Sequence, residues 1–371
     1  MKIACIGTGA MGGAIMRAVC RKYNAGDITV TDKNTENFAV AVARSLPENF
    51  RGTFTLEADE LGKTMDNILK ICAWLLENHA DRNAMLLGIG GGITTDMTGF
   101  TASIYKRGIR FAYLPTTFLA QVDAAIGGKT GVNFENYKNI LGVIRQPEFT
   151  YVCPEVLGTL TYRDFLSGAA ELVKTFIIDD SGDNYEKAVT ILSEIHDATD
   201  HTGAIALHHA ELEDLIAAAA RVKAGVVERD EFEMGERRKL NLGHTFAHAI
   251  EWEAHNREQS MGEVNAGVHG ISHGEAVAMG MIMAAEASEY YYADDKSQPV
   301  AAQGIVKKLT EDFRRCGLPV ECPYPITALA EAMKQDKKSE NGIVHFILIR
   351  AIGDVRIEDL PVDDVVSWIS K

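Results

Sequence analysis

The chain has 371 residues and a formal net charge of −15 at pH 7, and 46% of its residues are hydrophobic while 24% are charged. This length favours two domains, since one domain typically holds about 100–200 residues. The negative charge disfavours nucleic acids and anionic membranes as partners, and no apolar run reaches the roughly 18–20 residues that a membrane span needs. The six cysteines form no C-x-x-C pair, which favours reduced thiols and a cytoplasmic protein.

The first part of the chain alternates predicted strands and helices. Short apolar runs predict strands, and apolar residues at helical spacing predict helices between them. The strands are expected at Ile3–Ile6, Ile28–Thr31, Ala84–Ile89 and Phe111–Leu114, and the helices at Met11–Tyr23, Thr64–Asn78 and Asp96–Tyr105. Continuous apolar strands are typical of a parallel sheet that is buried on both faces. We therefore predict an α/β, Rossmann-like N-terminal domain with a parallel sheet over residues 1–154.

The pattern becomes mostly helical after Pro154. Helical spacing predicts helices at Phe165–Ile178, Tyr185–Ile195, Leu212–Glu228, His244–Trp252, Gly274–Tyr292, Ala301–Cys316 and Thr327–Lys334. One strand is expected at Val344–Ile349, and the polar, glycine-rich stretch Asn256–Ser272 predicts an exposed loop. We predict a mostly α-helical C-terminal domain over residues 155–371.

Two glycine-rich turns each have the form of a pyrophosphate-binding site. The first, Gly7–Gly12, matches G-x-G-x-x-G, and Asp32 lies 20 residues beyond Gly12. The second, Gly90–Gly92, follows a buried strand and precedes a helix, where successive backbone N–H groups attract an anion. A lone G-x-G-x-x-G is weak evidence, because a tight strand–helix turn produces the same pattern.

Histidines and carboxylates indicate a candidate metal site. His244 and His248 are four residues apart and so share one face of a predicted helix. An isolated pair of this kind is more often two ordinary helix histidines than a metal site, which needs a third ligand. Glu171, in an apolar helix where an unpaired carboxylate is costly, and His273 are candidates for it. Two imidazoles and one carboxylate are typical of catalytic zinc.

Basic residues flank these polar positions in several places. Each of them alone is typical of a surface charge. Together, on an acidic protein, they form a candidate pocket for a small anion. They are Lys129, Lys138, Lys174, Lys223, Arg237 and Lys337.

Read in chain order, eight sequence blocks resemble the 3-dehydroquinate synthase family. They are GGGITTDMTGF, YKRG, LPTTFLAQVDAAIGGKTGVN, YKN, GAAELVK, ERRKLNLGHTFAHAIE, HGEAVAMGM and MKQDKKSENG, and the resemblance runs from about Glu57 to Gly353. It implies a sugar phosphate cyclase of the shikimate pathway that uses catalytic NAD and zinc, with cobalt as a substitute. The implied substrate is 3-deoxy-D-arabino-heptulosonate 7-phosphate. A homodimer with a Rossmann-like and a helical domain is also implied.

The resemblance also implies roles for individual residues. The implied zinc ligands are Glu171, His244 and His273. The implied substrate-binding and catalytic residues are Arg107, Asp123, Lys129, Asn139, Lys174, Lys223, Arg237, Asn241, His248 and Lys337. The implied NAD contacts are Asp32, Glu60, Lys63, Gly91, Gly92, Ile93, Asp96, Thr116, Thr117, Asp123, Lys129, Lys138 and Thr159. His248 is thus assigned to the substrate rather than to the metal.

Some features depart from the family pattern. Asp59 and Thr95 stand where the family commonly has glycine, and the segment between His244 and His273 is long. The first 30 residues are closer in appearance to pyrroline-5-carboxylate reductase. We assign the pyrophosphate to the turn Gly90–Asp96, because the blocks that bring cofactor and substrate together follow it. Gly7–Gly12 is interpreted as a strand–helix turn that mimics the fingerprint.

Three other functions remain open at this point. A related cyclase acting on a different sugar phosphate would carry most of the same blocks. A metal-dependent NAD polyol dehydrogenase would share the architecture, but a neutral alcohol does not need so many cations. A non-catalytic NAD-binding relative is disfavoured by the complete set of three metal-ligand types.

Overall fold

The computed structural model describes most of the chain. The described residues are 3–5, 28–43, 51–57, 59–135, 137–179, 181, 183–261, 270–293, 304–335 and 343–369. The predicted turn Gly7–Gly12, the predicted helix Met11–Tyr23 and the candidate Lys337 lie outside them. No helix in these ranges is both long and apolar enough to cross a membrane.

The chain divides into two compact units. The first comprises Met1–Phe165 together with Ile205–Phe232, and the second comprises Leu166–Ala204 together with Glu233–Lys371. The predicted domain boundary after residue 154 stays a prediction.

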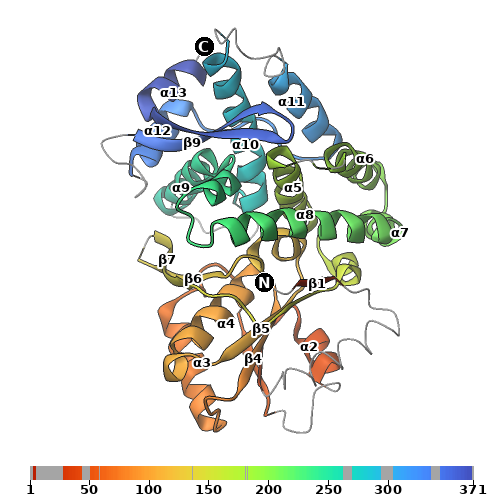
Figure 1. The fold of residues 1–371 in the computed structure, drawn as a ribbon, viewed down its shortest axis with the longest axis vertical. Helices are drawn as coiled ribbons and strands as arrows, with labels where there is room; N and C mark the ends of the chain where they lie inside the picture. The colour runs from red at the N-terminus through yellow and green to blue at the C-terminus, as the bar shows by residue number, and fades with distance from the viewer. Residues whose placement is uncertain are drawn as a thin grey trace. The chain divides into compact units, whose positions relative to one another are not determined.

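A parallel sheet forms the centre of the first unit (Figure 1). Six strands among the described residues lie in the order β1-β8-β5-β4-β2-β3, and every pair is parallel. Their bounds are β1 Ile3–Cys5, β2 Ile28–Asp32, β3 Thr53–Leu56, β4 Met85–Gly90, β5 Arg110–Pro115 and β8 Thr150–Val152. The predicted parallel sheet is confirmed.

Helices cover both faces of this sheet. Along β4, Leu86 joins one apolar cluster with helices α3 (Met65–Glu77) and α4 (Gly92–Ile104), whereas Leu87 joins another with α2 (Glu36–Ala43) on the opposite face. Neighbouring side chains of a strand point to opposite faces, so a strand covered on both faces is apolar throughout. The helices are α2 Glu36–Ala43, α3 Met65–Glu77, α4 Gly92–Ile104 and α8 His209–Arg229, with the short turns η1 Tyr105–Arg107, η2 Ala120–Ala124 and η3 Pro154–Thr159. An antiparallel hairpin of β6 Lys129–Phe134 and β7 Tyr137–Ile144 completes the unit.

Helix α4 begins four residues earlier than predicted. The sequence predicts a start at about Asp96, and glycines are poor helix formers. In the structure Gly91 caps the helix and Gly92 is its first residue. A Cβ atom at Gly90 would lie 2.4 Å from Asp32 Oδ2, and one at Gly91 would lie 3.0 Å from Thr117 Cγ2. Close packing against β2 and the segment after β5 therefore requires glycine at the end of β4 and at the helix cap.

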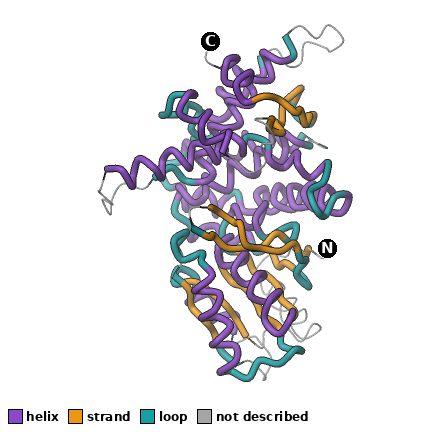
Figure 2. The backbone as a smooth tube through the Cα atoms, turned by 90° about the vertical axis from the view of Figure 1, so that its left-hand side faces the viewer, coloured by secondary structure: helices purple, strands orange, loops and turns teal. Residues whose placement is uncertain are grey.

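The second unit is mostly helical (Figure 2), as predicted. Its elements are α5 Tyr162–Ile178, whose first residues belong to the first unit, α6 Asn184–Asp197, α7 His201–Leu207, η4 Glu236–Asn241, α9 His244–Met261, α10 His273–Tyr291, α11 Ile305–Arg315, α12 Ile326–Gln335 and α13 Val362–Ile369. The predicted strand at 344–349 lies within β9 Ile343–Ala351, which pairs antiparallel with β10 Asp354–Pro361.

Two features of α9 and α10 matter for the site. Helix α10 is buried along nearly its whole length, and a Cβ atom at its Gly280 would lie 2.2 Å from the carbonyl oxygen of Gly243, just before α9. The two helices therefore pack closely at this point, because both residues there are glycines without a side chain. Helix α9 continues to Met261, so the predicted loop Asn256–Ser272 is wrong at its start. Residues 256–261 include no glycine or proline that would end the helix earlier.

Candidate active site

Three helices of the second unit bring a carboxylate and two imidazoles together. Glu171 lies in α5, His244 begins α9 and His273 begins α10. Glu171 Oε1 is 3.6 Å from His244 Nε2 and 3.5 Å from His273 Nε2. One ligand atom from each of the three residues lies within 4.8 Å of the other two. This arrangement has the residue types and the spacing of a site for a divalent metal ion.

Local sequence explains why the start of α10 faces Glu171. Ser272 caps the helix by accepting the N–H of Glu275, and the Glu275 carboxylate accepts the N–H of Ser272. The next N–H, that of Gly274, donates to Ser167 Oγ on α5 at 3.0 Å. Ser167 is one helical turn before Glu171 and so lies on the same face of α5. A Cβ atom at Gly274 would lie 2.3 Å from Ser167 Cα, so glycine permits this contact.

The carboxylate of Glu171 fits a cation. It is fully buried, and Oε1 has no hydrogen-bond partner among the described residues. Lys174 Nζ lies 2.5 Å from Oε2. Burial alone would raise the pKa of Glu171, but Lys174 and the two histidines outweigh it and hold the pKa well below its usual range. A buried carboxylate oxygen that faces two imidazole nitrogens is suited to a divalent metal ion.

The two histidines differ in their surroundings. Burial and the nearby Lys174 lower the pKa of His244, which favours the neutral ring that binds metals. Its Nδ1 lies 3.1 Å from the carbonyl oxygen of Leu242. Burial also acts to lower the pKa of His273, but the neighbouring carboxylates of Glu171 and Glu251 raise it to about 10. A bound cation would compete with a proton for the His273 nitrogen that faces Glu171.

Three other predicted residues of the second unit lie in α9 or just before it. The rings of His248 and His244 meet edge-on with centroids 5.6 Å apart, and His248 is not one of the three residues that meet the metal-site geometry. Arg237 and Asn241 lie in η4 just before α9, and Arg237 is buried. Asn241 Nδ2 donates to Glu233 Oε1 at 2.5 Å. Sequence reasoning missed Glu233, whose one signal was its place in a charged stretch before the histidine block.

In the first unit, the turn after β4 fits a phosphate. The N–H groups of a helix's first turn have no acceptor within the helix, so the start of α4 presents free donors. The bare glycines let neighbouring groups approach them closely: a Cβ atom at Gly92 would lie 3.2 Å from Ala124 Cβ. The N–H of Thr116 donates to the carbonyl oxygen of Gly90 at 2.9 Å, which holds the end of β5 beside this turn.

Asp32 braces the same turn from the end of β2. Its Oδ1 accepts the backbone N–H groups of Asn34 at 3.0 Å and Thr35 at 3.1 Å. Its Oδ2 accepts the hydroxyl of Thr94, in the first turn of α4, at 2.9 Å. The carboxylate therefore links the end of one strand to the glycine turn that follows the neighbouring strand.

A second group of predicted residues meets at Lys63. Lys63 Nζ donates to Asp96 Oδ2 and to Asn139 Oδ1, both at 2.6 Å. Burial raises the pKa of Asp96, although Lys63 opposes this. Asn139 has a φ of 52°, in the left-handed region that most residues avoid. Two hydrogen bonds from Lys63 thus join three residues that are distant in sequence.

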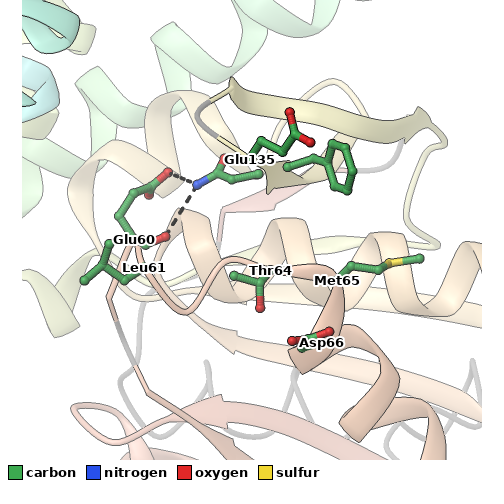
Figure 3. Close-up of a pocket in the computed structure, with 8 residues that line it drawn as sticks. Glu60, Leu61, Thr64, Met65, Asp66 and Glu135 are labelled. Atoms are coloured by element: carbon green, nitrogen blue, oxygen red, sulfur yellow. Dashed lines mark hydrogen bonds between the residues drawn. The ribbon is translucent and has the colours of Figure 1, made fainter. Parts of the chain in front are cut away.

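Asn133, which sequence reasoning missed, ties these segments together. Its N–H donates to the Lys63 carbonyl at 2.9 Å, and its Oδ1 accepts the N–H of Asn139 at 2.9 Å. Its Nδ2 donates to Glu60 Oε1 at 2.8 Å, one of the dashed contacts of Figure 3. The pocket shown there has a volume of about 310 Å³ and is lined by Glu60, Leu61, Thr64, Met65, Asp66, Asn133, Phe134 and Glu135. Glu60 is the one lining residue that the sequence predicted.

The remaining predicted residues of the first unit are placed as follows. Lys223, in α8, donates from Nζ to the carbonyl oxygen of Asp123 at 2.7 Å and to its Oδ1 at 2.6 Å. Asp123 lies in the π-helical turn η2, a feature that is frequent at functional sites. The others lie elsewhere in the unit, Arg107 in η1, Lys129 in β6, Lys138 in β7, Thr117 after β5 and Thr159 in η3.

Comparisons with solved structures define the class of fold. The chain is similar to the 2-epi-5-epi-valiolone synthase ValA of Streptomyces hygroscopicus subsp. jinggangensis 5008, solved with NAD+ and Zn2+ bound, with a TM-score of 0.80, 21% identity, and coverage of 100% of this chain and 97% of that one. It is also similar to 2-deoxy-scyllo-inosose synthase complexed with carbaglucose-6-phosphate, NAD+ and Co2+, with a TM-score of 0.77, 21% identity, and coverage of 99% and 96%. The fold is therefore that of the cyclase and dehydrogenase-like proteins.

Sequence comparisons identify the family. The family model for the 3-dehydroquinate synthase N-terminal region matches residues 53–167, and that for the C-terminal region matches residues 168–339. The chain is 40% identical over 299 residues to the 3-dehydroquinate synthase of Pyrococcus abyssi, covering 81% of this chain and 79% of that relative. It is 34% identical over 370 residues to that of Rhizobium johnstonii, covering 99% and 93%. The chain belongs to the 3-dehydroquinate synthase family.

Proposed function

We propose that this protein is a 3-dehydroquinate synthase. It converts 3-deoxy-D-arabino-heptulosonate 7-phosphate to 3-dehydroquinate and inorganic phosphate, and it is a carbon–oxygen lyase that depends on NAD and zinc, with cobalt as a substitute. The observation that carries the proposal is the cluster of buried Glu171 with His244 and His273 in a chain of this family. A cytoplasmic homodimer in the shikimate pathway is part of the same proposal.

The chain's own residues would hold both cofactors. Glu171, His244 and His273 would hold the metal, and the N–H groups at the start of α4 would hold the pyrophosphate. When bound, NAD supplies reversible hydride transfer and zinc polarises the substrate oxygen concerned. Asp32, Glu60 and Lys63, with the other predicted NAD contacts, complete the cofactor assignment.

The proposed substrate residues bind anions and handle protons. Lys174 and Arg237, both buried in the second unit, would bind the carboxylate and phosphate through charge-assisted hydrogen bonds. In the first unit, Lys223, fixed by Asp123, is a further predicted substrate-binding cation. His248 would accept the proton that leaves a substrate hydroxyl group and would later return it. Loss of phosphate breaks a C–O bond, and the later ring closure forms a C–C bond without net oxidation.

A polyol dehydrogenase remains the second candidate, because the fold also occurs in a probable glycerol dehydrogenase from Sinorhizobium meliloti at a TM-score of 0.60 and 16% identity. The number of cations among the predicted substrate residues favours the synthase, because a neutral alcohol does not need so many of them.

One assay separates the two functions. Purified protein is mixed with the heptulosonate phosphate, NAD and zinc, and inorganic phosphate and NADH absorbance are followed together. The synthase releases phosphate without accumulating NADH. NADH accumulation with a simple polyol, and no phosphate release, would assign the protein to the dehydrogenases.

A further inference from the structure

A second carboxylate contacts one of the three candidate metal ligands. Glu251 Oε1, on α9, lies 3.2 Å from Nδ1 of His273. The other nitrogen of the same ring, Nε2, lies 3.5 Å from Glu171 Oε1. The Glu251 side chain is only 9% exposed, so water competes weakly for this contact. The His273 ring therefore lies between two carboxylates, one on each of its nitrogens.

The helical repeat of α9 accounts for the position of Glu251. Glu251 follows His244 by seven residues, which is two helical turns, so both lie on one face of α9. Helix α10 packs against that face: its Gly280 approaches Gly243 at the start of α9, and its His273 reaches Glu251 two turns further along. One face of α9 thus supplies a candidate ligand and a contact to the other histidine.

The two histidines receive different acceptors at Nδ1. His244 meets the neutral backbone carbonyl of Leu242, whereas His273 meets a carboxylate. An N–H at Nδ1 that donates to a carboxylate fixes the tautomer, orients the ring and makes the opposite nitrogen a stronger donor to a metal. Nε2 of His273 is the nitrogen that faces Glu171, so the contact with Glu251 directs this nitrogen toward the cluster.

We propose that Glu251 is a positioning residue of the metal centre, acting through His273 to raise the affinity for the bound divalent cation. This inference rests on the metal site of the proposed function. It adds to that site an acidic residue outside the three ligands, which does not itself contact the metal.

The test measures zinc affinity directly, by competition with a chromophoric chelator. Glu251→Ala removes the acceptor and is expected to weaken zinc binding by about 10–100-fold. Glu251→Gln keeps an oxygen acceptor but loses the charge, so its affinity is expected between those of Glu251→Ala and the parent protein. Glu253→Gln is the matched control: it lies on the same helix and pairs with Arg257, and it should leave zinc affinity unchanged. Circular dichroism checks that each variant is folded.

Two outcomes separate this inference from the proposed function. If the parent protein binds zinc and folded Glu251→Ala binds it equally tightly, the inference is wrong while the metal site stands. If the parent protein binds no zinc, the proposed function and this inference both fail. If Glu251→Ala does not fold, Glu251→Gln decides: an affinity equal to that of Glu253→Gln would overturn the inference.

Discussion

Replacing Gly280 by Ala should separate α9 from α10 and weaken both the fold and the metal centre. The added Cβ would lie 2.2 Å from the Gly243 carbonyl oxygen, where ordinary contact begins at 3.4 Å, so the overlap is about 1.2 Å. The neighbour is backbone and cannot rotate away. Overpacking of this kind costs about 1–3 kcal/mol, and with so large an overlap we take the upper end. Alanine recovers about 1 kcal/mol of helix propensity.

The expected net change is therefore a loss of about 2 kcal/mol in the free energy of unfolding. His244 directly follows Gly243, so displacing this backbone should also lower zinc affinity. The assay is urea unfolding with and without zinc, combined with chelator competition. Gly158→Ala is the matched control, because a Cβ there meets nothing within 4 Å. If Gly280→Ala is as stable as Gly158→Ala and binds zinc equally well, the packing argument is refuted.

The remaining predictions concern the cofactors. Glu171→Gln should lose zinc, about one ion per chain by metal analysis, and should lose phosphate release; full activity after thorough chelation would contradict the metal assignment. Turnover should consume many substrate molecules per NAD with no build-up of NADH absorbance, and stoichiometric NADH would refute a redox-neutral reaction. Gly92→Val should place a side chain in the anion site at the start of α4 and weaken NAD binding by orders of magnitude, measured by titration. Gly9→Ala should leave NAD affinity nearly unchanged, and the reverse pattern would move the pyrophosphate to the N-terminal turn.

Local patterns predicted the regular elements well where the burial of an element gives its sequence a clear apolar pattern. The run Ala84–Ile89 is apolar throughout, and it forms β4 at the centre of the sheet with both faces covered. Local patterns failed at the ends of two helices. The sequence predicted the start of α4 at about Asp96, yet the helix begins at Gly92, after two glycines that pack closely against Asp32 and Thr117. Polar composition argued for a loop from Asn256, yet α9 continues to Met261.

The candidate site depended much less on local pattern. Spacing drew attention to His244 and His248, and residue chemistry added Glu171 and His273 as candidate ligands. The resemblance to the family then selected Glu171, His244 and His273 and assigned His248 to the substrate. Asn133 and Glu251 had no signal that set them apart from other polar residues, and Glu233 had only its place in a charged stretch before the histidine block. Each became visible through a contact between segments that local periodicity does not relate.

The sequence by itself determined the order of the elements and the two fold classes along the chain, because these follow from apolar periodicity. It also determined the family, because the family's sequence blocks occur in chain order. The tertiary structure decided which polar groups meet. Glu171, His244 and His273 converge because three helices pack at close range, with glycine at Gly274 and Gly280 where backbones approach. The reason is physical: helix period determines which face a side chain occupies, but the partner of that face depends on packing between segments far apart in the chain.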